Sequence, residues 1–309
     1  AVILSSVLFA YPAMSAITSV SGPNSIPRDL SLEGAPPQII SPPADVNDDA
    51  AWNTSMEGFD EQQGITLEED INVDGGSIAA GTTVSSHMIF LNTGPGNDRA
   101  PNSHYDVTWT FDGEVLGVMS DSRGTFEMTT SELLGATDTV YPNNPFAARG
   151  IDGNRSPSGP FPFDGYTIVG NTLTVGMAVS EPGDWIRVVT AYKKNVTIDI
   201  KPGGEPNCFN LNGHGVIPVA ILGTENFDPC TEVDPDSLGL LGMSVRVRGK
   251  QGPLSHCEDV NADGYFDLVV QFEDDASEWS EGQTSAELTG TLFDGTPIVG
   301  TDSICVTQI

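Results

Sequence analysis

The stretch YDVTWTFDGEVLGVM, residues 105–119, alternates large apolar side chains with polar ones on both sides of an Asp-Gly pair. Val107, Trp109 and Phe111 are spaced two residues apart, so an extended strand places all three on one face. Asp-Gly is typical of a two-residue turn, because both residues tolerate the positive φ that such a turn requires. The chain then returns through a second apolar run. This stretch therefore predicts two β-strands joined as a hairpin.

Similar apolar runs follow one another at short spacing through most of the chain. Gly170-Asn171 and Asp294-Gly295 each predict a further hairpin, and a strand is expected from Trp185 to Tyr192. More strands are expected at residues 65–73, 83–91, 196–202, 215–223, 244–249 and 266–273. Helical periodicity is nearly absent, and only residues 129–136 suit a turn or two of helix. We therefore expect an all-β fold of two tandem antiparallel, jelly-roll-like β-sandwich domains.

The domain boundaries follow from changes in composition along the chain. Residues 51–192 predict the first sandwich and residues 193–309 the second. Residues 21–50 hold six prolines and few large apolar residues, which indicates an extended linker. Residues 1–20 form an apolar segment without a charged side chain, either an assembly arm or the remnant of a signal peptide. As an arm, the segment would form a filament-core helix or a strand donated to a neighbouring subunit.

The charge balance excludes several classes of partner. The chain of 309 residues carries 12 Lys and Arg against 43 Asp and Glu, a net charge of −31. Such a surface cannot neutralise a nucleic-acid backbone, and it is repelled by anionic membranes. We therefore expect no nucleic-acid partner and no stable membrane span in the mature form.

All of the cysteines lie in the last third of the chain. The four are Cys208, Cys230, Cys257 and Cys305. No two of them are spaced C-x-x-C, which argues against a zinc or thioredoxin-type site. An even number in one domain is typical of two disulfides in an extracellular or cell-surface protein, and the sequence leaves all three pairings open.

The sharpest local motif is D-x-N-x-D-G-x-x-D, which begins at Asp259. Calcium prefers six to eight hard oxygen ligands, and this spacing turns alternate oxygens inward while the glycine permits the sharp turn. Glu258 is a further candidate donor, and the alternative is an Asx-rich turn without a metal. The predicted Ca²⁺ ligands are Asp259, Asn261, Asp263, the carbonyl of Tyr265 and Asp267.

The residues after this loop distinguish it from an EF-hand. An EF-hand needs a bidentate Glu at position 12, inside a helix, whereas this chain has Val270 there. Phe266, Leu268, Val270 and Phe272 alternate with more polar neighbours, which is a strand pattern. The loop is therefore predicted to join two β-strands and to bind calcium with modest affinity.

No catalytic signature accompanies this loop. The four histidines are scattered, and the sequence contains no H-E-x-x-H, G-x-S-x-G or Walker-type loop. We therefore expect the protein not to be an enzyme. Exposed aromatic side chains on a sandwich bind sugars, with Trp52 and Trp279 as candidates, while Trp109 and Trp185 lie in strand patterns and are expected in the core.

Longer strings give a family resemblance. The stretch from Val196 to Val306, with IDIKPGG, PNCFNLNGHGVIPVAILG, EDVNADGYFDLVV and LFDGTPIVGTDSICV, resembles a module of secreted surface proteins of environmental bacteria and archaea, many with a PEP-CTERM-type sorting tail. Upstream, GTTVSSHMIFLN, FDGEVLGVMSD and EPGDWIRVV look like another module of such exported proteins. The loop itself is similar to those of dockerins, thrombospondin type 3 repeats and integrin propeller blades. The resemblance implies a surface location, a β fold and bound calcium, and no particular activity.

These observations favour a secreted, calcium-stabilised structural protein. We expect a self-assembling extracellular filament or surface-layer subunit, a homo-oligomer or homopolymer joined through residues 1–20. The alternative is a monomeric module that binds a glycan or another surface partner.

Overall fold

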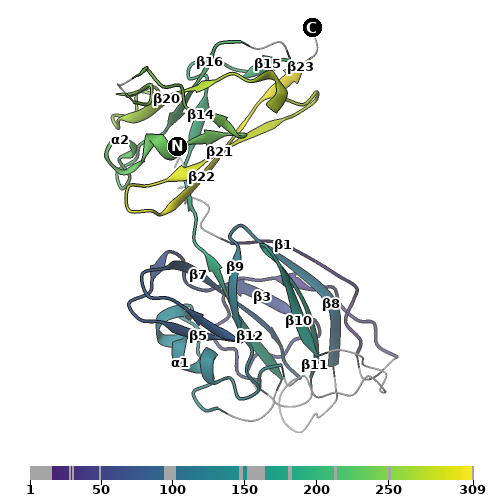
Figure 1. Cartoon of the computed structure of the whole chain (residues 1–309). Coiled ribbons are helices and arrows are strands. Elements are labelled where there is room, and N and C mark those ends of the chain that lie inside the picture. Colours follow the sequence, from purple (N-terminus) through teal and green to yellow (C-terminus); the bar gives the residue numbers. More distant parts are fainter. Residues whose placement is uncertain are drawn as a thin grey trace, which may run out of the picture. The chain divides into compact units, whose positions relative to one another are not determined.

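The computed structural model describes residues 16–27, 29, 31–48, 50–93, 102–145, 149–151, 164–179, 183–211, 214–249 and 252–307. Strands dominate the regular structure, so the prediction of an all-β fold is confirmed. The chain divides into two compact units, with the division between Tyr192 and Lys193. Each unit builds its own sheets and core (Figure 1).

The first unit contains two sheets. One has the order β1-β8-β11-β10, from β1 (Ile17–Ser21), β8 (Asn102–Phe111), β11 (Thr172–Val179) and β10 (Gly165–Val169). The other has the order β2-β3-β7-β12-β9, from β2 (Gln38–Ile39), β3 (Glu57–Asp60), β7 (Thr83–Leu91), β12 (Asp184–Ala191) and β9 (Val115–Met119), with β4 (Ile65–Thr66) also pairing with β7.

The second of these sheets is covered on both faces. On β12, Ile186 and Val188 pack into the core shared with the facing sheet, whereas Trp185 and Val189 pack on the opposite side. That opposite side is covered in part by α1 (Thr125–Leu134) and by the hairpin of β5 (Ile71–Val73) and β6 (Gly76–Ile78). A strand buried on both faces carries apolar residues at consecutive positions.

The 105–119 stretch forms two strands, but the prediction that they pair as a hairpin is wrong. β8 pairs with β1 and β11, while β9 pairs with β12 in the other sheet. Both strands direct apolar side chains, among them Trp109 and Val118, into one core from opposite layers. The Asp-Gly turn therefore crosses between sheets, and a Cβ on Gly113 would lie 1.9 Å from the carbonyl oxygen of Ala191.

Two other predicted turns do join hairpins. β10 and β11 pair with Val169 opposite Thr172, and Gly170 between them has φ 61. In the second unit the Asp-Gly turn lies in the loop between β21 (Ser285–Thr291) and β22 (Pro297–Ser303), where Gly295 has φ 89. Both glycines adopt the positive φ that the turn motif anticipates.

Residues 21–50 are not a linker, contrary to the prediction. β2 pairs in parallel with β3, and Val46 is fully buried, with its N–H donating to Val140 O at 3.0 Å. The prolines interrupt strand pairing without preventing this segment from lying on the sheet. Likewise β1, within the expected N-terminal arm, pairs with β8 of its own chain; residues 1–15 lie outside the described residues.

The second unit also contains two main sheets. One has the order β13-β22-β21-β17-β18, which adds β13 (Lys194–Asn195), β17 (Gly239–Leu240) and β18 (Met243–Ser244). The other has the order β14-β16-β20-β19, from β14 (Ile198–Ile200), β16 (Val216–Ile221), β20 (Asp267–Glu273) and β19 (Ser255–Glu258). A short parallel pair joins β15 (Cys208–Asn210) to β23 (Cys305–Thr307), and α2 (Pro229–Glu232) is a single helical turn.

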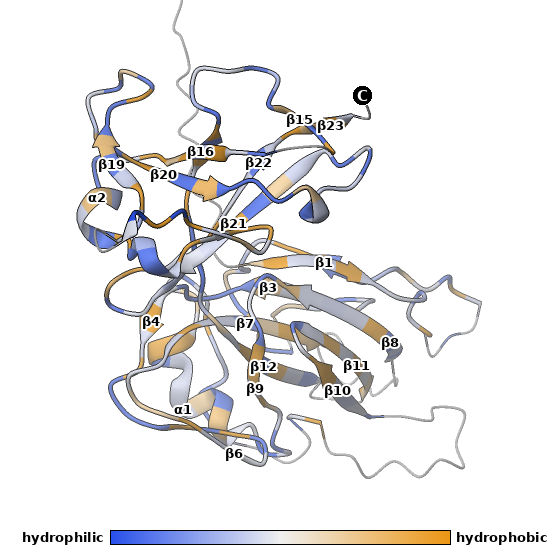
Figure 2. Ribbon diagram, turned by 45° about the horizontal axis from the view of Figure 1, so that its top comes forward, coloured by the Kyte–Doolittle hydropathy of each residue, from blue (hydrophilic) through white to orange (hydrophobic). Residues whose placement is uncertain are grey.

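One hydrophobic core fills the space between these sheets. Ile217, Val219 and Phe272 enter it from one sheet, and Leu288 and Ile298 enter it from the other. Figure 2 shows hydrophobic and polar residues alternating along the strands, as half-buried strands require. The cysteines pair as Cys208 with Cys305 and Cys230 with Cys257, so two disulfides are present and their pairing is resolved by the fold.

Candidate calcium loop

The predicted calcium loop connects two neighbouring strands of one sheet. β19 ends at Glu258, which pairs with Asp267 at the start of β20. Val270, at the position where an EF-hand would need its glutamate, is fully buried in the core of the unit. The strand after the loop is therefore confirmed, and an EF-hand is excluded.

Three polar side chains of the loop fold back onto its own backbone. The N–H of Asp263 donates to Oδ1 of Asp259 at 3.1 Å and to Oδ1 of Asn261 at 3.0 Å. The N–H of Gly264, which has φ 94, donates to Oδ2 of Asp259 at 3.1 Å. The N–H of Tyr265 donates to Oδ1 of Asp263 at 2.9 Å. These exposed oxygens each keep a free lone-pair direction, so the turn gathers hard donors of the kind that calcium prefers.

Asp267 plays a different part from the other predicted ligands. Its side chain is fully buried, and its two oxygens accept from the N–H groups of Gly223, at 2.8 Å, and Val260, at 2.8 Å. Gly223 follows β16, and Val260 is the second residue of the loop. The carboxylate thus ties the start of the loop to a neighbouring strand, and its direct ligation of a metal stays a prediction.

The structure brings together only part of the predicted ligand set. Among the described residues, no three His, Cys, Asp or Glu side chains converge as a metal centre. The backbone N–H of Asp263 donates to Oδ1 of Asp259, and the side-chain amide of Asn261 donates to Oδ2 of Asp263 at 2.9 Å. A cation here would therefore need the Asn261 oxygen and the main-chain carbonyl of Tyr265 as well as the two carboxylates. In kind and spacing these donors fit calcium.

The loop is bordered by a disulfide. Cys257 lies on β19 two residues before the loop and is bonded to Cys230 of α2. The sulfur of Cys230 is 3.7 Å from the carbonyl oxygen of Asp267. Glu258, the further candidate donor, is exposed and lies 3.3 Å from Nε2 of His256. The base of the loop is thus fixed covalently and by hydrogen bonds, while its tip is open to solvent.

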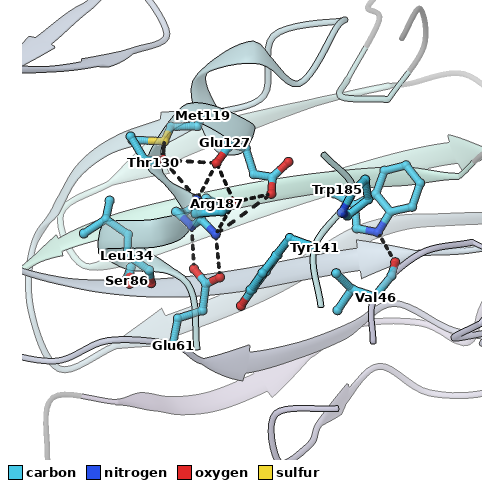
Figure 3. A network of polar contacts seen from close by, with 12 residues as sticks. Val46, Glu61, Ser86, Met119, Glu127, Thr130, Leu134, Tyr141, Trp185 and Arg187 are labelled. Atoms are coloured by element: carbon cyan, nitrogen blue, oxygen red, sulfur yellow. Dashed lines mark hydrogen bonds and ion pairs between the residues drawn. The ribbon is translucent and has the colours of Figure 1, made fainter. Parts of the chain in front are cut away.

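A buried ionic network in the first unit was not anticipated from the sequence (Figure 3). Arg187 on β12 makes a two-pronged contact with Glu61, Nε to Oε2 at 2.7 Å and Nη2 to Oε1 at 2.8 Å. Its Nη1 donates to the carbonyl oxygen of Glu127 at 2.6 Å and to Oγ1 of Thr130 at 3.0 Å. Its guanidinium also lies over the ring of Tyr141, 5.3 Å from the ring centre.

The network is closed to solvent. The side chains of Arg187 and Glu61 are 0% exposed, and Glu127 also pairs with Arg149, which is likewise buried. Burial favours the neutral form of Arg187, but the charges of Glu61 and Glu127 outweigh it and raise the pKa of the guanidinium. A substrate cannot reach these buried groups. Their contacts hold α1 against the sheet that contains β12. The feature of the sequence that could have indicated this network is an arginine between apolar neighbours on a predicted strand.

The aromatic candidates separate into buried and exposed groups. Trp109 and Trp185 are buried, as predicted. Trp279 is not an exposed sugar contact, because it is only 5% exposed and stacks on Phe209 with ring centres 4.3 Å apart. Trp52 is 63% exposed and remains a candidate.

The two histidines of the first unit with buried side chains are held by hydrogen bonds. His104 accepts from the N–H of Met56 at 2.9 Å, and its other ring nitrogen lies 2.8 Å from the carbonyl oxygen of Pro23. Burial lowers the pKa of His104, so the ring is neutral and donates to Pro23. His87 lies between Asp60, at 2.7 Å, and Thr190, at 3.0 Å. Asp60, His87 and Thr190 follow the order of a carboxylate, a base and a hydroxyl, but His87 and Thr190 are both 0% exposed, so their contacts lie inside the packed unit.

Comparisons with models of protein families, with curated proteins and with solved structures found no match. In the part of the chain that the structure describes, no helix is long and apolar enough to cross a membrane. The two cysteine pairs at disulfide distance indicate a non-reducing environment.

Proposed function

We propose that this chain is a secreted, non-catalytic structural protein of the cell surface, stabilised by calcium at the 259–267 loop. The two disulfides support export, because such bonds are rare in reducing compartments. The acidic surface supports a role for divalent cations, which relieve repulsion between carboxylates. Among the described residues, Arg187 is buried in an ion pair with Glu61 and His87 is hydrogen-bonded to Asp60, which supports a structural role for these groups over a catalytic one.

The observation that carries this proposal is the way in which the loop is anchored. Its exposed oxygens are held at the end of a hairpin whose base is fixed by Asp267 and by the Cys230–Cys257 disulfide. A cation bound by Asp259, Asn261 and Asp263 would close the turn that starts β20, a core strand. Binding free energy therefore adds to the stability of the unit, by about 2.7 kcal/mol when calcium is 100-fold above its Kd.

Thermal unfolding of the full chain tests this function. The unfolding temperature of the second unit should rise as Ca²⁺ is added over the millimolar range typical of extracellular modules. Mg²⁺ at the same concentration should raise it far less, because Mg²⁺ dehydrates reluctantly and prefers octahedral sites with several waters. An unfolding temperature that does not respond to Ca²⁺ would contradict the proposal.

Self-assembly is the second part of the proposal and concerns residues 1–15. These residues are apolar and uncharged, which favours burial against another copy of the chain. Residues 17–21 form β1, which pairs with β8 of the same chain. The proposed contact with another copy is therefore assigned to the residues before β1. Electron microscopy of the full chain, with and without Ca²⁺, should show ordered oligomers that disappear when residues 1–15 are removed. Monodisperse monomers in every sample would refute assembly.

A second candidate function is glycan binding by the first unit. Trp52 exposes 63% of its surface, and Tyr105 and Tyr166 line a hollow of about 260 Å³. Aromatic side chains beside hydroxyl and carboxylate groups are suited to sugar rings. A glycan array should then show a preference that Trp52→Ala or Tyr166→Ala weakens, whereas an assembly subunit should show none.

A further inference from the structure

A hollow in the second unit gathers oxygen donors away from the calcium loop. It has a volume of about 450 Å³ and lies between β14, the turn at residues 203–207 and the end of β22. Asp199, Glu205, Asn207 and Asp302 line it, and the described residues that line it include no Lys, Arg or His. The hollow therefore offers hard oxygen ligands, and none of the described residues that line it supplies a compensating cation.

Asn207 presents a buried oxygen that has no partner in the described part of the chain. Its residue is 7% exposed, and its Nδ2 donates to Oδ2 of Asp302 at 3.3 Å and to the carbonyl oxygen of Ser303 at 3.5 Å. These two acceptors fix which end of the amide is the nitrogen. The opposite atom, Oδ1, accepts no hydrogen bond, and Asn207 borders the hollow. Buried carbonyl oxygens normally have a partner, so this one has room for a hydrogen-bond donor or a cation.

The walls of the hollow are held in place before any ligand binds. The Cys208–Cys305 disulfide follows Asn207 directly, and the N–H of Cys305 donates to the carbonyl oxygen of Asn207 at 3.1 Å. Oδ2 of Asp302 also accepts from the N–H of Ile200 at 2.8 Å. These contacts fix Asn207 and Asp302 to each other and to β14, so this part of the hollow needs little ordering on binding.

The charges around the hollow repel one another. The negative charges of Asp302, Glu205 and Asp267 all act on the carboxyl group of Asp199. The nearest lysine in sequence, Lys201, is engaged elsewhere, since its Nζ donates to the carbonyl oxygen of Cys208 at 2.6 Å and lies over the ring of Phe209. A divalent cation would relieve the repulsion, whereas an anionic ligand would increase it.

We propose that this hollow is a second divalent-cation site, in which Asp199, Glu205 and Oδ1 of Asn207 bind calcium. Asp302 positions Asn207 through its hydrogen bond. An all-oxygen donor set selects calcium or magnesium over transition metals, and a roomy, irregular hollow favours calcium. Since no three acidic side chains of the described chain converge, the amide oxygen and water complete the shell. The site uses no residue of the 259–267 loop.

Counting the bound metal tests the proposal. Equilibrium dialysis of the full chain against Ca²⁺ alone should find two ions per chain for the wild type. Asp199→Asn combined with Glu205→Gln should remove one ion, and Asp263→Ala in the loop should remove the other. The matched control is Glu287→Gln combined with Asp236→Asn, which makes the same change of charge at exposed positions and should keep two ions.

The outcomes separate the two sites. If the wild type binds a single ion, and only the hollow variant loses it, the result supports this site and refutes calcium binding at the loop. A hollow variant that keeps the wild-type count overturns this proposal, whatever happens at the loop. A second measurement covers a variant that fails to fold: wild-type crystals grown in Ca²⁺ should show an anomalous-scattering peak beside Oδ1 of Asn207. An empty hollow at saturating Ca²⁺ overturns the proposal.

Discussion

Replacement of Arg187 by Met should strongly destabilise the first unit. Arg187 is the centre of the buried network, with two short contacts to Glu61 and two to the start and middle of α1. Methionine keeps much of the volume of the side chain but removes every donor. The carboxylate of Glu61, itself 0% exposed, would then be buried without its cation.

The size of the effect follows from this burial. Removing one partner of a buried ion pair costs about 3–5 kcal/mol, because the remaining charge is desolvated and unpaired. That is a large part of the roughly 5–15 kcal/mol that stabilises a typical domain. For a unit of this size, it lowers the unfolding temperature by about 2–4 °C per kcal/mol. Arg187→Met with Glu61→Gln removes both charges, so it should lose less than the sum of the two single changes.

Urea unfolding followed by tryptophan fluorescence measures these losses. In a Trp279→Phe background all remaining tryptophans, Trp52, Trp109 and Trp185, report on the first unit. The single and double variants complete a mutant cycle around Arg187 and Glu61. A loss below about 1 kcal/mol for Arg187→Met, with native far-ultraviolet circular dichroism, would refute the burial of the network. Strict additivity in the cycle would refute the direct pairing.

Two further predictions concern the first unit. Burial lowers the pKa of His104 below its ordinary 6.5, so as pH falls through that value only the unfolded chain takes up a proton. The unfolding free energy of the wild type should therefore decrease below pH 6.5, and that of His104→Gln should decrease less steeply; equal slopes would contradict a neutral, buried ring. Gly113→Ala should cost about 1–3 kcal/mol, because its Cβ would meet the carbonyl of Ala191 at 1.9 Å, and fluorescence-detected unfolding measures the loss. Gly76→Ala, with no atom within 4 Å of the new Cβ, is the control, and equal losses for the two would show that the close approach is absent.

The positions of individual strands could be predicted from the sequence because strand periodicity is local. β8, β12 and β20 lie where alternating or continuous apolar runs place them. The two-residue turn at Gly170 was predictable for the same reason, since its positive φ is a property of the turn itself. The number of disulfides followed from the cysteine count.

The partners of these elements could not be predicted, because pairing depends on burial across the whole unit. The turn at Gly113 carries a strong hairpin motif, yet it crosses between two layers. The prolines at 21–50 indicate a linker, but Val46 packs in a buried cluster with Phe90 and Trp185 on the outer face of a sheet. The burial of Trp279 could not be predicted, because nothing near it in the sequence shows that its ring stacks on Phe209.

The candidate site was predictable in part. The loop was located by its spacing, and its place between two strands follows from the alternation after Asp267. The separate role of Asp267 was not predictable, because one of its backbone partners, Gly223, is remote in sequence. The same applies to Asn207 and Asp302, which are 95 residues apart and meet only in the fold.

The most direct measurement is the stability of Asp263→Ala with calcium and with a chelator. Its contacts to Tyr265 and Asn261 are exposed, so in chelator the variant should lose at most about 1 kcal/mol. In Ca²⁺ at 100-fold above the Kd of the wild-type loop, it should lose up to about 2.7 kcal/mol more. An equal loss under both conditions would mean that the loop is a turn held by its own hydrogen bonds, and that calcium does not stabilise this protein through it.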